Sequence, residues 1–196
     1  MLNLDKDFFF SYLYLGKHNP KRSISMNDHN FAWDQIWDIN KGRPNLGMNT
    51  RVEVYRLMQF TMRAVLEQEY GDDIAREILK KSGRLAGAEF CKKLLDTSLS
   101  ITKFTAQLTE MLLELSIGIL KVEKFDSKNL SFVVTVSEDL DCSGLPVSGY
   151  TVCDYDEGFL EGVFCAYTGK DFVVKEVDCW CTGERTCRFT IDVKMS

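Results

Sequence analysis

Three cysteines and one glutamate lie close together near the C-terminus of this 196-residue chain, in the segment EVDCWCTGERTC. They are Glu176, Cys179, Cys181 and Cys187. Thiolates and carboxylates are ligands that Zn²⁺ accepts, and a structural zinc site normally has four of them. The spacing C-x-C-x5-C is not a paired-cysteine zinc signature. The spacing alone therefore leaves a second interpretation open, in which these cysteines are small buried apolar residues.

The cysteine count favours metal or redox chemistry over a disulfide framework. The chain has seven cysteines, an odd number that cannot all pair. The apolar run FFFSYLYLG lacks a secretory cleavage site, and no segment reaches the roughly 20 apolar residues of a membrane-spanning helix. We therefore expect a cytoplasmic protein, whose thiols stay reduced. The net charge of −5 argues against direct nucleic-acid binding.

Residues 49–196 are expected to form the main domain, and its first part is helical. Apolar residues recur at helical spacing in two segments, with breaks expected at Gly71 and Gly83. We interpret both apolar stripes as core. They consist of Tyr55, Met58, Met62, Val65 and Leu66 in the first segment, and of Ile101, Phe104, Leu108, Met111, Leu112, Leu115 and Ile119 in the second.

After Gly118 the apolar period changes to two, which predicts strands over ILKVEKF and from Phe132 to Val136. A helix follows over 154–168, with a capping box formed by Asp154 and Glu157. Gly169 is expected to end this helix. Two glycines one turn apart, at 158 and 162, would let the helix approach a neighbour closely.

The segments DFVVKEVDCW and CRFTIDV are predicted to be a final hairpin turning at TGER. A two-residue turn would place Trp180 opposite Cys187, and a three-residue turn would place Cys181 there instead. Glu176 and Cys179 are an odd number of residues apart, so the strand must bulge, end or twist between them if both are to face one site. This order of elements predicts an α+β fold, with a helical layer packed on an antiparallel sheet of four to five strands.

Residues 1–48 are rich in aromatic side chains and show no sustained period. We interpret them as an N-terminal arm or short hairpin that covers part of the domain or of a second subunit in a dimer. His18 and His29, the two histidines of the chain, both lie in this arm. Histidine is therefore nearly excluded as a ligand at the cysteine cluster.

Residues 142–189, from CSGLPVSGYTVC to ERTCRF, resemble the C-terminal half of the 4-vinyl reductase domain family. The shared features are a Cys opening a Gly-containing helix, a Gly-Lys after the helix, Glu-x2-Cys, a Gly turn, and a Cys before an aromatic residue. Such domains form the sensor regions of phenol- and xylene-responsive transcription activators and are similar in fold to the TRAPP trafficking subunits. The resemblance thus implies a TRAPP-like ligand-binding fold.

The resemblance also implies a structural zinc held by three Cys and one Glu. Carried onto this chain, those ligands are Cys153, Glu176, Cys179 and Cys187. Cys181 is the substitute ligand if the hairpin register differs. A site with four protein ligands is closed and structural. Its expected role is to tie the start of the 154–168 helix to the final hairpin.

The resemblance further implies a pocket for an apolar or aromatic ligand between the helices and the sheet. Plain core packing explains each candidate lining residue equally well. Residues 50–196 contain no histidine, which makes phenol itself a doubtful ligand. The candidates are Phe104, Leu108, Leu112, Phe132, Val134, Phe159 and Val163.

These features favour a zinc-stabilised, small-molecule-binding domain of the sensor type, homodimeric and without catalysis of its own, that signals through a separate partner protein. One alternative is a reductase-type enzyme acting on a tetrapyrrole or vinyl group. The sequence has no G-x-G-x-x-G fingerprint and no haem-attachment motif to support it. Another alternative is a scaffold or assembly adaptor, as the trafficking subunits suggest.

Overall fold

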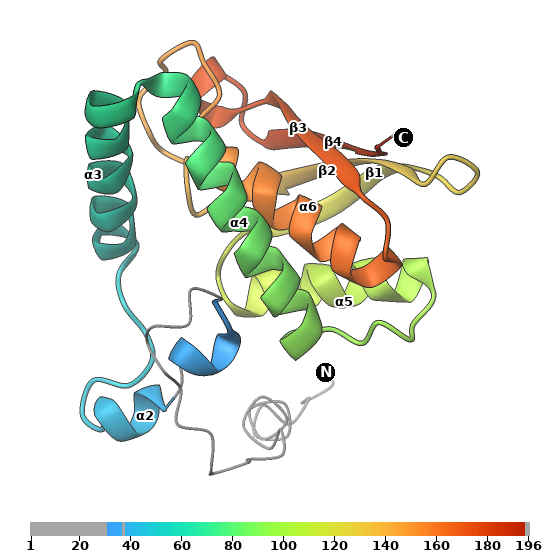
Figure 1. Cartoon of the computed structure of the whole chain (residues 1–196), viewed down its shortest axis with the longest axis horizontal. Coiled ribbons are helices and arrows are strands. Elements are labelled where there is room, and N and C mark those ends of the chain that lie inside the picture. The colour runs from blue at the N-terminus through green and yellow to red at the C-terminus, as the bar shows by residue number, and fades with distance from the viewer. Residues whose placement is uncertain (1–30, 37, 195–196) are drawn as a thin grey trace.

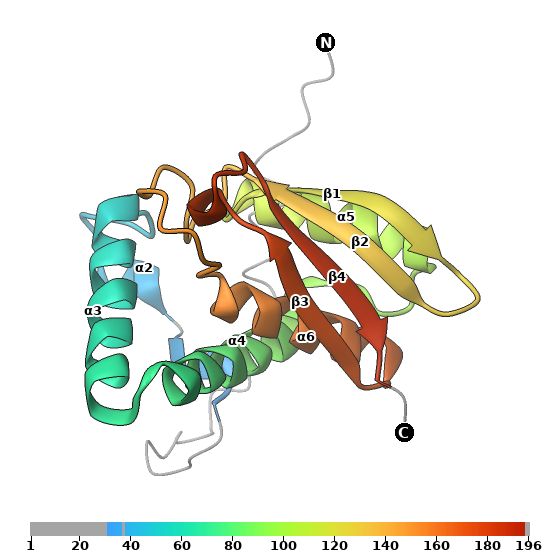
Figure 2. The ribbon, with the colours of Figure 1, turned by 90° about the horizontal axis from the view of Figure 1, so that it is seen from above.

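A computed structural model describes residues 31–36 and 38–194, and the structural statements below refer to these residues. A four-stranded antiparallel sheet of order β1-β2-β4-β3 carries helices α5 and α6 on one face, and α4 packs on the outer side of α6 (Figures 1 and 2). The predicted α+β class, with helices packed on an antiparallel sheet, is confirmed. The strands are β1 (Ile119–Asp126), β2 (Ser131–Ser137), β3 (Phe172–Asp178) and β4 (Cys187–Val193).

Four helices form the rest of the domain, and three short helical segments lie in its connections. The long helices are α3 (Val52–Tyr70), α4 (Asp72–Leu94), α5 (Ile101–Glu114) and α6 (Asp154–Thr168). The short ones are η1 (Trp33–Ile36), α2 (Ile39–Gly42) and η2 (Trp180–Thr182). The described part of the predicted arm thus consists of η1 and α2, whereas residues 1–30, with both histidines, lie outside the described residues. The division of the chain at residue 48 stays a prediction.

The core lies between the sheet and helices α5 and α6. Strand β2 aligns Phe132 with Ile191 and Val134 with Phe189 of β4, and all four side chains are buried. Because side chains alternate along a strand, these residues present one apolar face to the helices. Phe164 of α6 packs on this face, with its ring centroid 4.8 Å from that of Phe132.

Helices α4 and α6 approach each other so closely that only glycine fits between them. A Cβ atom added at any of four glycines would overlap a backbone carbonyl oxygen of the opposite helix. The close approach predicted from Gly158 and Gly162 is therefore confirmed. The four contacts are Gly83 to Tyr155, Gly87 to Phe159, Gly158 to Lys80 and Gly162 to Arg84.

The predicted helix break at Gly83 is wrong. Gly71, with φ of 84°, does separate α3 from α4, but Gly83 lies inside α4. A glycine inside a helix costs about 1 kcal/mol relative to alanine. The backbone contact with α6 explains why the residue is glycine nevertheless.

Basic residues of α4 pair with acidic residues of α6 beside this glycine contact. The three acidic residues are buried, and carboxylates are rarely buried without a partner. Successive turns of the two helices are thereby joined, which fixes their relative register. The pairs are Arg76–Asp154 at 3.3 Å, Lys80–Glu157 at 2.9 Å and Arg84–Glu161 at 3.0 Å.

Three residues of the apolar stripe of α3, which was predicted to be core, are exposed in this structure, and the other two, Tyr55 and Leu66, are half-buried. Met58, Met62 and Val65 have 58%, 50% and 56% of their surface accessible. The buried residue of this helix is Arg63 instead. Helix α3 stands at one edge of the molecule and turns its polar side inward (Figure 1).

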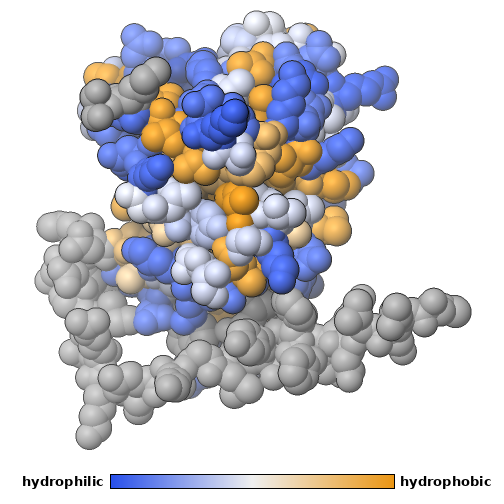
Figure 3. Space-filling model, turned by 90° about the vertical axis from the view of Figure 1, so that its right-hand side faces the viewer, coloured by the Kyte–Doolittle hydropathy of each residue, from blue (hydrophilic) through white to orange (hydrophobic). Residues whose placement is uncertain are grey.

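The opposite face of the molecule is mixed in character. Figure 3 shows apolar side chains interspersed with polar ones on this side, where the β1–β2 turn projects. Within residues 31–36 and 38–194, no helix combines the length and the apolar character needed to cross a bilayer.

We expect Gly87→Ala to destabilise the domain, although alanine is the better helix former. The new methyl group would push α4 away from α6, and overpacking of this kind costs about 1–3 kcal/mol. Urea unfolding followed by circular dichroism would measure the loss. Gly42→Ala is the matched control, because a Cβ there meets nothing within 4 Å. Equal midpoints for the two variants would contradict the proposed role of the glycine contact.

Candidate functional site

Four cysteine side chains converge at one end of the sheet. The Sγ atoms of Cys142, Cys153, Cys179 and Cys187 all lie within 4.8 Å of one another, and all four residues are buried. Cys153 Sγ lies 3.8 Å from both Cys179 Sγ and Cys187 Sγ, and Cys142 Sγ lies 3.1 Å from Cys187 Sγ. We call these four residues the cysteine cluster.

The dimensions of the cysteine cluster fit a tetrahedral metal site. With metal–sulfur distances of about 2.3 Å, the sulfur atoms of such a site are separated by about 3.8 Å. Two of the separations given above match this edge, and the third is shorter. Four thiols are also the donor set of structural zinc sites.

Each cysteine reaches the cluster from a different element. Cys153 is the N-cap residue of α6, and Cys187 is the first residue of β4. Cys179 follows β3 directly, after an irregularity in pairing between Glu176 and Asp178. Cys142 belongs to the turn-rich segment between β2 and α6. The site therefore joins the two ends of the 138–153 connection to the final hairpin.

Three of the four predicted metal ligands lie in the cysteine cluster, and Glu176 lies beside it. Its carboxylate is buried, and Oε2 accepts a hydrogen bond of 3.1 Å from the backbone N–H of Cys153. Oε1 is buried and has no hydrogen-bond partner within the described part of the chain. Burial, with a further contribution from the charge of Cys179, raises the pKa of Glu176 to about 8.

The predicted bulge between Glu176 and Cys179 is confirmed, because the pairing of β3 with β4 shifts there and the strand ends. Both predicted registers of the hairpin turn are wrong. Cys187 is not paired with Trp180 or Cys181, because residues 179–186 form a longer connection that includes η2.

Cys181, the predicted substitute ligand, lies outside the cysteine cluster. It is buried in η2, and its carbonyl oxygen accepts hydrogen bonds from the N–H groups of Ser148 and Gly149. It thus anchors the connection before α6. Cys165 is half-buried on α6 and lies outside the cluster as well.

The capping box predicted at Asp154 and Glu157 is wrong. Asp154 is the first residue inside α6, and its carboxylate binds Arg63 at 2.7 Å and Arg76 at 3.3 Å. The carboxylate of Glu157 binds Lys80 and accepts a hydrogen bond of 2.7 Å from the N–H of Glu176. These acids therefore fix α6 to its neighbours rather than capping its own backbone.

Neighbouring acidic groups suit a cation at the cysteine cluster. Contacts with the other thiols, above all that of Cys142, lower the pKa of Cys179 and raise that of Cys153. Among themselves, the thiols therefore favour one thiolate, whereas a divalent cation would stabilise the thiolate form of each. Carboxylate oxygens of Asp139 and Asp156 lie within 4.8 Å of each other and of Cys153 Sγ.

Helix α3 holds the segment that contains Cys142. Tyr55 Oη donates to Asp141 at 2.8 Å, and Gln59 donates to the same carboxylate at 2.5 Å. The Arg56 guanidinium donates to the carbonyl oxygens of Leu140 at 2.7 Å and Ser143 at 2.9 Å. The inner side of α3 thus satisfies the backbone of this connection.

Cys142 was missed by the sequence reasoning. It opens the segment that carries the family resemblance, but it lies in a Ser-, Gly- and Pro-rich connection without periodicity. A periodic pattern tells which face a residue occupies only within a helix or strand. The signal that could have found it is the cysteine itself, because the connection that contains it leads to Cys153, the N-cap residue of α6.

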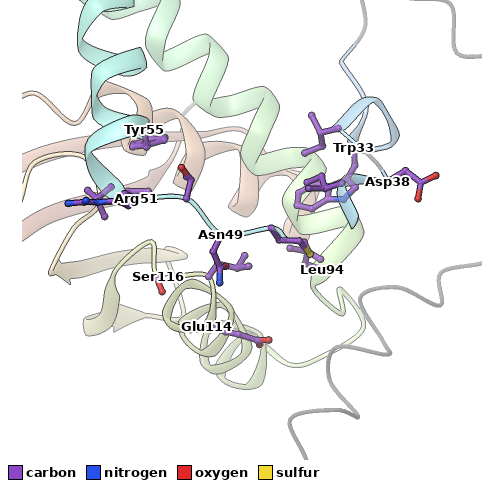
Figure 4. Close-up of a pocket in the computed structure, with 15 residues that line it drawn as sticks. Trp33, Asp38, Asn49, Arg51, Tyr55, Leu94, Glu114 and Ser116 are labelled. Atoms are coloured by element: carbon purple, nitrogen blue, oxygen red, sulfur yellow. The ribbon is translucent and has the colours of Figure 1, made fainter. Parts of the chain in front are cut away.

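A cavity of about 690 Å³ lies between the start of α3, the ends of α4 and α5, and η1 (Figure 4). Apolar side chains dominate its wall. Polar groups, among them Arg51, Tyr55 and Glu114, lie on the α3 and α5 sides. The apolar lining consists of Trp33, Ile36, Ile39, Met48, Val52, Leu94, Leu115 and Leu140.

The residues predicted to line a ligand pocket do not line this cavity. Six of them are buried in the core, and Phe159 is partly buried and packs its ring against that of Phe90. Their role in ligand binding stays a prediction. The six core residues are Phe104, Leu108, Leu112, Phe132, Val134 and Val163.

Comparison of sequences places the resemblance in the same segment. Residues 132–193 match the family model of the 4-vinyl reductase domain, which confirms the predicted resemblance over that segment. An uncharacterised protein of Methanocaldococcus jannaschii is 25% identical over 146 residues, which is 74% of this chain and 80% of that protein.

Three solved structures share the fold. The phenol-responsive sensory domain of the transcription activator PoxR, solved with phenol, has a TM-score of 0.57 at 15% identity and covers 74% of this chain and 76% of its own. A vinyl-4-reductase family protein from Methanocaldococcus jannaschii has a TM-score of 0.53 at 16% identity, and the match covers 80% of this chain and 89% of that protein. A trafficking protein particle complex subunit 3 from Naegleria fowleri, covalently bound to palmitic acid, has a TM-score of 0.59 at 9% identity. This match covers 74% of this chain and 95% of that protein.

Proposed function

We propose that this chain is a zinc-stabilised, small-molecule-binding domain of the sensor type, without catalysis of its own. The observation that carries the proposal is the cysteine cluster, whose four buried thiols converge with the dimensions of a tetrahedral metal site. The match to the 4-vinyl reductase domain and the fold shared with a phenol-responsive sensory domain support the sensor type.

Zinc is the metal that we propose for the cysteine cluster. Four thiolates in a tetrahedral arrangement suit zinc or an iron centre. A site with four protein ligands has no open position for substrate, so zinc would act as a cross-link between α6, the final hairpin and the connection that contains Cys142. The seven free thiols suit the reducing conditions of the cytoplasm.

For the ligand, we propose an apolar or aromatic small molecule bound in the cavity beside α3. Ligand pockets are typically apolar with a few polar groups, and they range from about 300 to 1,000 Å³. The cavity matches both criteria. Relatives of the fold support this class of ligand, because one was solved with phenol and another with palmitic acid.

The outer side of α3 is proposed as the interface of a homodimer. A two-fold interface brings the same surface of both subunits together, and an apolar helix face is complementary to itself. Its members include Leu57, Met58, Met62 and Val65, all at least half exposed. Signalling to a separate partner protein would then act through this dimer.

We expect the purified chain to contain one zinc per molecule, and Cys153→Ser and Cys187→Ser each to reduce that content at least tenfold. Each variant removes one of four ligands from a closed site, and structural zinc contributes on the order of 10 kcal/mol to folding. Plasma mass spectrometry gives the metal content, and thermal unfolding gives the stability. Cys165→Ser is the control and should retain the metal. Unchanged zinc content and melting temperature in the two cluster variants would refute the zinc site.

For the cavity, we expect Leu115→Arg to weaken the binding of an apolar fluorescent dye at least tenfold. The substitution would replace part of the apolar wall by a longer, charged side chain, which an apolar ligand binds less well. Leu113→Arg is the matched control, because this residue is exposed near the end of α5, two residues before Leu115, and does not line the cavity. Equal dye affinity in both variants would count against the cavity as the binding site.

Met58→Glu combined with Met62→Glu should convert the expected dimer to a monomer, because the two new charges would face the same charges of the second subunit. Light scattering after size-exclusion chromatography measures the mass directly. Leu85→Glu on α4, another exposed apolar residue, should leave the dimer intact. A monomeric wild-type chain would rule out this interface.

A further inference from the structure

We infer that Cys142 and Glu176 are alternative ligands for one position of the metal site, and that helix α3 determines which of them binds. The inference rests on the proposed metal and goes beyond it. It assigns a regulatory role to residues of α3 that do not touch the metal site.

Five donors are available for four positions. The four thiols of the cysteine cluster lie within 4.8 Å of one another, and the Glu176 carboxylate is fixed beside them by the N–H of Cys153. Only 3% of Glu176 is exposed, and its Oε1 has no hydrogen-bond partner among the residues that the structure describes. Leaving a buried acceptor unsatisfied is unfavourable, and such groups are rare in folded proteins. A metal ion would satisfy this oxygen when Cys142 leaves the fourth position.

The two competing ligands differ in how firmly their segments are held. Glu176 lies in β3, and its N–H donates to the buried carboxylate of Glu157 on α6. Cys142 lies in a connection without helix or strand. The remaining ligands come from the sheet and the start of α6. Cys142 is therefore the ligand that can leave while the rest of the site keeps its geometry.

Contacts with α3 help to position Cys142, whose N–H also donates to Asp139 of its own segment at 3.0 Å. Arg56 binds carbonyl oxygens on both sides of it, those of Leu140 and Ser143, and Gln59 binds the carboxylate of Asp141. Figures 1 and 2 both show this connection beside α3. The outer side of α3 is exposed and apolar within the described chain, so the contacts given above are made by its inner side.

The same segment borders the cavity, which Leu140 and Tyr55 both line. A molecule bound there would contact α3 and the connection that contains Cys142 together. A shift of either would withdraw the Cys142 thiolate and leave its position to the Glu176 carboxylate. The Glu176 carboxyl would give up its proton as it binds and the departing Cys142 thiolate would take one up, so the exchange leaves the total charge of the buried site unchanged. Metal coordination would thus respond to the cavity without loss of the metal.

The test is the number of sulfur ligands in the full-length zinc-loaded chain, measured by X-ray absorption at the zinc edge. We expect four sulfurs in the wild type. We expect three sulfurs and one oxygen in Cys142→Ser, with zinc still bound at one per chain. Cys142→Ser combined with Glu176→Gln should lose zinc at least tenfold. Cys142→Ser combined with Asp156→Asn is the matched control and should behave as Cys142→Ser alone.

Control by α3 is tested with all ligands present. Arg56→Ala combined with Gln59→Ala should lower the mean sulfur number below four, and adding Glu176→Gln should remove the oxygen ligand. A sulfur number of four in the Arg56 and Gln59 variant would overturn the role of α3. Equal zinc retention with and without Glu176→Gln in the Cys142→Ser background would overturn the exchange, as would three sulfurs in the wild type. A wild type that binds no zinc would instead refute the proposed metal site.

Discussion

The backbone contact between α4 and α6 is the constraint on which the rest of the structure depends. Gly83 and Gly87 face Gly158 and Gly162 with no side chain between them, so the two helices have one possible separation. Three ion pairs alongside fix their register. Because Cys153 is the N-cap residue of α6, this contact also places the first thiol of the cysteine cluster. A structural feature without any chemistry of its own thus determines where the metal ligands meet.

Helix α6 lies between α4 and the sheet, and this position explains why its carboxylates are buried and paired. Its buried carboxylates face basic residues of α4, and one of them, Glu157, also orients Glu176 through the backbone of β3. Buried charges are tolerated when they are paired and hydrogen-bonded. Asp154, Glu157 and Glu161 therefore serve the packing of the helices, whereas the Cys153 thiol at the N-terminus of α6 serves the site. Both groups are positioned by the same helix, so a loss of packing would also disturb the cluster.

Much of the fold was predictable because it is periodic. The alternation of Phe132, Val134 and Val136 predicted β2, and the stop at Gly169 predicted the end of α6. Periodicity also gave a wrong prediction for α3, whose apolar stripe was expected to be core. An apolar stripe shows which side of a helix is apolar, but it does not show whether the same chain buries that side. Gly83 was misread because only the partner helix shows why glycine is needed. Cys142 escaped because its position depends on contacts with Arg56 and Gln59, far away in the sequence.

Helix α3 turns its polar side toward the domain and leaves its apolar side exposed, which has a thermodynamic consequence for any partner that binds it. The helix is attached to the domain largely through hydrogen bonds and ion pairs, each of which contributes about 1 kcal/mol net. Its apolar surface is not used within the described chain, and burial of such surface would contribute about 25 cal/mol per Å². A partner on the outer side could thus outweigh several of the inner contacts. If a partner bound a displaced α3 more tightly than the helix in its present position, binding and the position of the 139–143 segment would be thermodynamically linked.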